Sequence, residues 1–112
     1  MAGPVDSLLQ LAAAIGRGET PRYEHNECYT SGAFDGLLVH AFGQEAFELL
    51  VALAARHAQV QETPEALPSY FNLLGQVARQ SGTTELPSAL ATVIASHPDL
   101  SEDLRSWYRL EA

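Results

Sequence analysis

Residues 67–78 read LPSYFNLLGQVA and carry the clearest helical pattern in this chain of 112 residues. Apolar side chains recur here at intervals of three and four residues, which places them on one face of an α-helix. The residues on that face are Leu67, Tyr70, Phe71, Leu74, Val77 and Ala78. Thr63, Pro64 and Glu65 supply a capping hydroxyl, a proline and an acid for the first turn, and Ser81 and Gly82 end the pattern. We therefore expect an amphipathic helix that buries this face in a core.

A shorter helix is predicted over residues 85–96. Its inward side chains are Leu86, Leu90, Val93 and Ile94. His97 and Pro98 end it. Because a proline is tolerated only in the first turn, Pro87 predicts a start near Thr84.

The last predicted helix begins after Ser101, which we expect to act as its cap. Its first turn is acidic and its last turn is basic, so the charges at both ends agree with the helix dipole. Its inward residues are Leu104, Trp107 and Tyr108.

On the N-terminal side, residues 4–15 predict a helix with Asp6 or Ser7 as a source of capping oxygens. Gly16 and Gly18 end it by adopting left-handed dihedral angles. The inward face consists of Val5, Leu8, Leu9, Ala12 and Ile15. The polar residues 16–32, which include Pro21, predict an irregular loop.

Residues 33–60 are expected to form two helices that meet at Gly43. One continuous helix is the alternative, because an internal glycine costs only about 1 kcal/mol relative to alanine. The first apolar face holds Phe34, Leu37, Leu38, Ala41 and Phe42, and the second holds Phe47, Leu50, Val51, Ala54 and Ala58. No segment of the chain alternates with the period of a strand. With short loops favouring antiparallel neighbours, we expect residues 1–112 to form a single all-α domain, a compact antiparallel bundle of five or six short helices.

The charge balance excludes several classes of partner. Fourteen acids against six arginines give a net charge of −8, and no cluster of cations is present to bind nucleic acid without sequence preference. No apolar run is long enough for a membrane span, and the N-terminus lacks the basic start of a signal peptide. A single cysteine, Cys28, suits a reducing compartment, so we expect a cytoplasmic protein that binds neither membranes nor nucleic acid.

A metal site has one weak candidate in the loop. His25 and Cys28 stand three residues apart beside Glu24 and Glu27. A structural zinc site normally shows paired motifs of this kind, and the sequence contains one. The other histidines are scattered at His40, His57 and His97. We therefore expect no metal and no cofactor.

Catalysis has no better support in the sequence. Cys28 could use His40 or His57 as a base, but no glycine-framed oxyanion site surrounds the thiol. Glu45 and Glu48 are three residues apart and more simply belong to a solvated helix face. We expect a protein that is not an enzyme.

Residues 73–107 read LLGQVARQSGTTELPSALATVIASHPDLSEDLRSW and resemble the second half of the bacterial effector-associated, death-like domains. The matching positions are Gly82, Leu86, Leu90, Ile94, Pro98, Leu100 and Leu104. The apolar face that starts at Phe34 is similar to the opening helix of that family, so the resemblance covers about residues 34–110. It implies a death-fold-like bundle that recruits a related domain by like-with-like contact in bacterial conflict or signalling.

Both lines of reasoning favour a non-catalytic interaction module or adaptor that binds another protein and can self-associate. The alternative is an acidic immunity protein that blocks the basic cleft of a toxin or nuclease. The exposed side of the last helix carries opposite charges that could meet a rotated copy of themselves. The charged residues are Glu102, Asp103, Arg105 and Arg109. A second candidate surface is the loop that bears Tyr23 and Tyr29.

Overall fold

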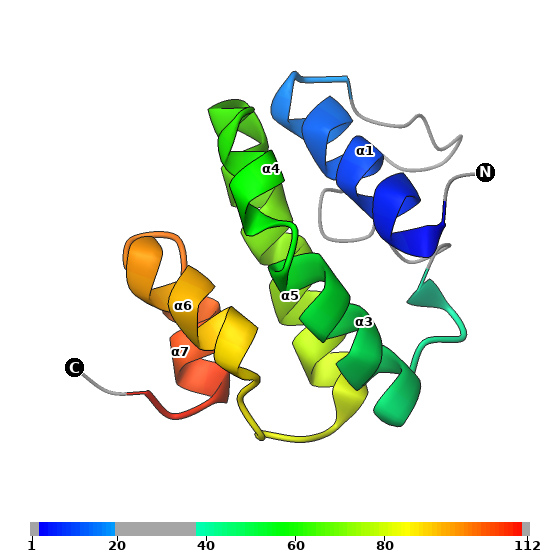
Figure 1. The fold of residues 1–112 in the computed structure, drawn as a ribbon, viewed down its shortest axis with the longest axis vertical. Helices are drawn as coiled ribbons and strands as arrows, with labels where there is room; N and C mark the ends of the chain where they lie inside the picture. Colours follow the sequence, from blue (N-terminus) through cyan, green and yellow to red (C-terminus); the bar gives the residue numbers. More distant parts are fainter. Residues whose placement is uncertain (1–2, 20–37, 111–112) are drawn as a thin grey trace.

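The computed structural model describes residues 3–19 and 38–110, and every regular element in these two ranges is helical (Figure 1). In chain order the elements are α1 (Pro4–Gly16), α3 (Gln44–Ala54), α4 (His57–Gln61), the 3-10 helix η1 (Pro64–Ala66), α5 (Leu67–Ser81), α6 (Ser88–Ser96) and α7 (Glu102–Trp107). The predicted all-α class is confirmed. Within the same ranges, none of the helices has the length and apolar character needed to cross a membrane.

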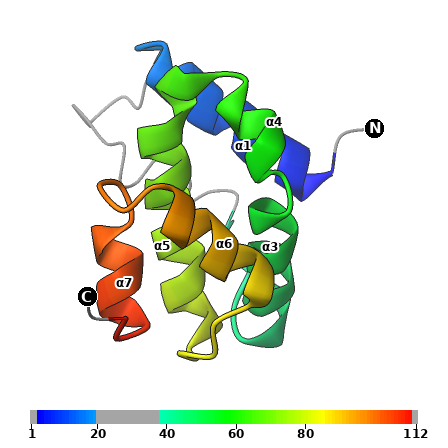
Figure 2. The ribbon, with the colours of Figure 1, turned by 60° about the vertical axis from the view of Figure 1, so that its left-hand side comes forward.

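Helix α5 lies at the centre of the bundle, where it contacts α1, α3 and α7. Figure 1 shows α1 on one side of α5 and the α6–α7 pair on the other, and Figure 2 shows α3 and α7 flanking α5. Because it has neighbours on several sides, α5 buries more of its surface than a single amphipathic face. Its fully buried side chains include Tyr70, Leu73, Leu74 and Val77.

The ends of α5 agree only partly with the expected caps. Gly82 adopts left-handed dihedral angles (φ 71°) and ends the helix as predicted. At the start, Thr63 makes no capping hydrogen bond, and residues 64–66 form the separate turn η1. The N-terminus of α1 also lacks a side-chain cap: Gly3 takes the cap position, and Asp6 instead pairs with Arg56 at 2.9 Å.

Gly43 separates α3 from the chain before it, which confirms the predicted break. Its φ of 59° is one that a residue with a Cβ rarely adopts, and its N–H donates to the carbonyl of Gln80 at 3.0 Å. The Gln80 amide in turn donates to the carbonyls of Leu38 and Ala41, at 2.9 and 2.8 Å. These three hydrogen bonds tie the residues before α3 to the C-terminal end of α5.

Two apolar residues predicted to face the core are exposed. Phe42 is 59% exposed because it lies in the irregular backbone just before Gly43, where the helical pattern no longer applies. Ala58 is exposed because α3 ends at Ala54 and a separate short helix, α4, starts at His57, so Ala58 no longer continues the apolar face of α3. Phe34 and Leu37, like residues 20–32 of the predicted loop, lie outside the described residues.

Helix α6 starts later than the predicted Thr84. Its first residue is Ser88, and Pro87 precedes it in an extended conformation (φ −66°, ψ 144°). Proline disfavours a helical backbone at the residue before it, so the chain up to Leu86 stays outside the helix. The predicted end at His97 is confirmed.

Candidate interaction surface on the last helix

One face of α7 is fixed to the core. Leu104 and Tyr108 are buried, and the indole N–H of the half-buried Trp107 donates to the carbonyl of Thr83 at 3.2 Å. Ser101 stands at the predicted cap position, but its buried hydroxyl donates to the carbonyl of Ile94 at 3.3 Å and makes no cap to α7. The inward face of α7 was therefore predicted correctly, and the role of Ser101 was not.

The C-terminus of α7 closes in a Schellman motif. The N–H of Leu110 donates to the carbonyl of Arg105 at 2.7 Å, and the N–H of Arg109 donates to that of Ser106 at 3.2 Å. Arg109 occupies the left-handed position of this motif with a φ of 58°, where glycine is the usual residue. This backbone geometry turns the chain after α7 and leaves the Arg109 side chain exposed.

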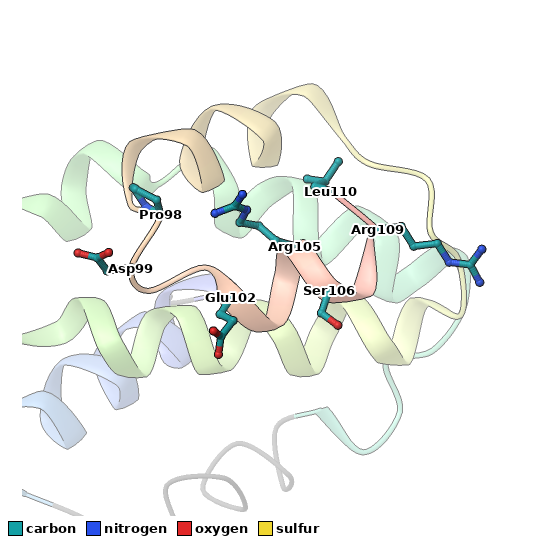
Figure 3. A pocket seen from close by; sticks show the side chains of 7 residues that line it. All are labelled: Pro98, Asp99, Glu102, Arg105, Ser106, Arg109 and Leu110. Atoms are coloured by element: carbon teal, nitrogen blue, oxygen red, sulfur yellow. The ribbon is translucent and has the colours of Figure 1, made fainter. Parts of the chain in front are cut away.

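An open hollow of about 670 Å³ lies along the outer side of α7 (Figure 3). Its lining residues are Pro98, Asp99, Glu102, Arg105, Ser106, Arg109 and Leu110. In Figure 3 the half-buried Arg105 extends into the space between Pro98 and Leu110, whereas Arg109 points away at the C-terminal end. We call these seven residues the α7 surface. It combines acids from the N-terminal side, arginines from the C-terminal side and two apolar groups.

The structure brings together three of the residues that the sequence singled out. Glu102, Arg105 and Arg109 all line the hollow. Asp103 is exposed on α7 but is not part of the lining. Tyr23 and Tyr29, the second candidate surface, lie outside the described residues.

The arginines of the α7 surface have no ionic partner within residues 3–19 and 38–110. The two ion pairs of that part of the chain join Arg17 to Glu19 and Arg56 to Asp6. Arg105 and Arg109 are thus cations held near acids of their own helix without pairing with them.

A histidine pair forms a second cluster, which the sequence analysis missed. The Nε2 atoms of His57 and His97 lie 2.9 Å apart, within hydrogen-bond distance. Phe71 contacts the His97 ring edge-on, and Tyr70 stacks beside His57. Burial and the neighbouring His97 lower the pKa of His57. The two histidines are forty positions apart in the sequence, and no short sequence motif predicts that they form a pair.

The described residues contain no candidate metal cluster. No group of three or more His, Cys, Asp or Glu side chains is placed to hold a metal ion in this part of the chain. Glu45 and Glu48 are exposed, as predicted for a solvated face. Cys28, with its neighbours His25, Glu24 and Glu27, lies outside the described residues, so the expectations about them stay predictions.

No protein-family model, no curated protein and no solved structure matches this chain. The resemblance to the bacterial death-like domains therefore remains a prediction that rests on the sequence pattern.

Proposed function

We propose that this protein is a non-catalytic interaction module that binds a second copy of itself or a related helical domain through the α7 surface. The observation that carries the proposal is the pair of arginines, Arg105 and Arg109, which stand without ionic partners in the described residues beside acids of the same surface. The family resemblance adds the setting, a bacterial conflict or signalling system.

The order of charges along the surface suits a symmetric contact. Asp99 and Glu102 lie on the N-terminal side of the hollow, and Arg105 and Arg109 lie towards the C-terminal side. A second copy turned about a two-fold axis places its acids against these arginines and its arginines against these acids. Such a self-complementary patch is the usual design of a two-fold dimer.

The expected affinity is modest. An exposed ion pair contributes only about 0–1 kcal/mol, and a stable interface buries on the order of 1,000 Å² or more. The apolar contribution comes from Pro98 and Leu110 in the hollow and from Leu100, which is 37% exposed in the adjoining loop. We therefore expect a weak contact whose specificity comes from charge and which weakens as salt rises.

The mixed charge of the α7 surface also distinguishes this proposal from the immunity protein. A protein that occupies a basic cleft needs a surface with predominantly negative charge. The α7 surface instead carries two arginines in its lining. This favours a related surface of mixed charge as the partner.

Charge reversal tests the proposal. Sedimentation velocity of the protein at low and moderate salt should show a self-association that Arg105→Glu weakens and the double change Arg105→Glu with Arg109→Glu abolishes. Arg17→Glu is the control, because Arg17 is also exposed and undergoes the same charge change. Arg17 caps the C-terminus of α1, the helix that Figure 1 shows on the other side of α5 from α7.

A complementary variant makes the test sharper. Asp99→Arg with Glu102→Arg should also lose self-association, yet a mixture of the two double variants should form heterodimers. Circular dichroism checks that each variant keeps its helical content. Self-association that survives in the doubly reversed protein, or that the Arg17 control loses equally, would show that the contact lies elsewhere.

A further inference from the structure

The contact between His57 and His97 joins two elements that are distant in the sequence. His57 is the first residue of α4, and His97 is the C-cap of α6. Their Nε2 atoms are 2.9 Å apart while the ring centroids are 4.9 Å apart, so the two rings direct their Nε2 edges at one another. A direct side-chain hydrogen bond thus connects the start of α4 to the end of α6.

Among residues 3–19 and 38–110, no carboxylate forms an ion pair with either histidine. From α5 it faces the rings of Tyr70 and Phe71, and α6 contains no charged residue. His57 is the only titratable residue within α4, and the causes that lower its pKa, burial and the charge of His97, include no acid.

The charged residues nearest in the sequence are engaged or point to solvent. The Arg56 guanidinium is bound by Asp6 at 2.9 Å and by Gln59 at 2.9 Å. Glu62 and Glu65, at the end of α4 and on η1, are exposed, and Asp99 is exposed in the lining of the α7 surface.

The hydrogen bond depends on how many protons the pair holds. A neutral imidazole has one N–H and one lone pair, so the pair joins an Nε2–H to an Nε2 lone pair, whichever histidine is the donor. One additional proton leaves that hydrogen bond in place. When both rings are protonated, two N–H groups and two positive charges face each other, and no acceptor remains between them.

The His97 side of the contact leads directly into the α7 surface. The carbonyl of His97 accepts the N–H of Leu100 at 3.1 Å, and the two residues between them, Pro98 and Asp99, line the hollow. The loop 97–100 is fixed at its far end by the buried hydroxyl of Ser101. The histidine contact thus holds the residue that directly precedes Pro98 and Asp99.

We propose that the His57–His97 pair is an acid-sensitive latch on the loop 97–100: it holds Pro98 and Asp99 in place at neutral pH, and it opens when both imidazoles are protonated. The effect of the latch on binding rests on the function proposed above; the latch itself does not. Opening requires a pH below 6.5, the ordinary pKa of histidine, because burial and the charge of His97 both lower the pKa of His57.

Two measurements on the unbound protein test the latch. In proton NMR, the His57 and His97 ring signals should titrate as a coupled pair in two separated steps, and His97→Gln should remove this coupling from His57. The amide of Leu100, corrected for its intrinsic exchange rate, should exchange at least about fivefold faster at acid than at neutral pH.

Three variants control the exchange measurement. His57→Phe keeps an aromatic ring beside Tyr70 but cannot titrate, so Leu100 exchange should be faster than in the unmodified protein and independent of pH. His97→Gln should behave in the same way. His40→Gln, which removes an exposed histidine, should leave the acid response unchanged. An acid response of Leu100 that persists in His57→Phe, or its absence in the unmodified protein, overturns the latch.

Self-association measured at neutral and acid pH then tests the link to binding. It should fall on acidification more steeply in the unmodified protein than in His57→Phe, which corrects for protonation of the surface carboxylates. Equal falls in both proteins would refute regulation by the latch. If neither protein associates at any pH, the proposed function fails, and the exchange measurement alone still decides whether the latch exists.

Discussion

Replacing Gly16 by alanine should destabilise this protein although alanine is the better helix former. Gly16 is the last residue of α1, and a Cβ built there would lie 2.2 Å from the carbonyl oxygen of Glu65 and 2.9 Å from the Cα of Ala66. Both are backbone atoms of η1, so no side-chain rotation relieves the clash and α1 must move away. Overpacking of this kind costs about 1–3 kcal/mol, against a gain of at most about 1 kcal/mol in helix propensity. With the full gain in propensity, we expect a net loss of up to about 2 kcal/mol.

Gly75→Ala is the matched control, because it makes the same substitution within α5. A Cβ at Gly75 would meet only the Arg79 guanidinium, at 3.7 Å, which is an ordinary contact with a flexible side chain. This variant should gain about 0.5–1 kcal/mol from helix propensity alone. Equilibrium unfolding in urea, with equal slopes for all proteins, measures both changes. A Gly16→Ala protein that gains as much stability as Gly75→Ala would refute the close approach of α1 to η1.

Two further predictions concern buried hydroxyls and the end of α7. Tyr70→Phe should lower the free energy of unfolding by about 1–2 kcal/mol, because the buried Tyr70 hydroxyl donates to the carbonyl of Leu53 at 2.8 Å. Tyr108→Phe should be neutral or stabilising, because the buried Tyr108 hydroxyl has no partner within the described residues. Urea unfolding compares the two, and equal losses would contradict the assignment. Arg109→Gly should raise the free energy of unfolding by up to about 1 kcal/mol, because it relieves the left-handed strain at φ 58°, and it should weaken self-association. Thermal unfolding measures the first effect and sedimentation the second. A lower midpoint of thermal unfolding would count against the Schellman geometry.

Apolar spacing was enough to predict most of the helices in the described residues, because each buries a face that is set by residues close together in the sequence. Leu8 and Ala12 in α1, and Leu74 and Val77 in α5, all face the core as their spacing predicts. Glycine was informative for a similar reason. The left-handed angles at Gly43 and Gly82 are local requirements of the backbone, so their positions alone indicated a break and an end.

The errors occur where contacts distant in the sequence decide the outcome. Gly16 was interpreted as a residue with left-handed dihedral angles, but it belongs to α1 and is needed because η1 approaches it closely. Ser101 was interpreted as the N-cap of the last helix, but its hydroxyl donates a hydrogen bond to the carbonyl of Ile94. The histidine pair depends on where α4 restarts after Ala54 and where α6 ends, so no local pattern contained it.

The α7 surface depends both on local sequence and on contacts distant in the sequence, and the backbone conformation at Arg109 is locally unfavourable. The chain has fourteen acids for six arginines, so an arginine could readily find a partner, as Arg17 and Arg56 do. Arg105 and Arg109, like the exposed Arg79, have no ionic partner among the described residues, and Arg109 also occupies a left-handed position that glycine would fill with less strain. Departures from locally favourable choices tend to gather at functional sites, because binding can retain residues that folding does not favour. Here the strained Arg109 lies at one exposed helix end, beside a hollow with apolar groups and the unpaired Arg105 in its lining, and this supports a binding role for the surface.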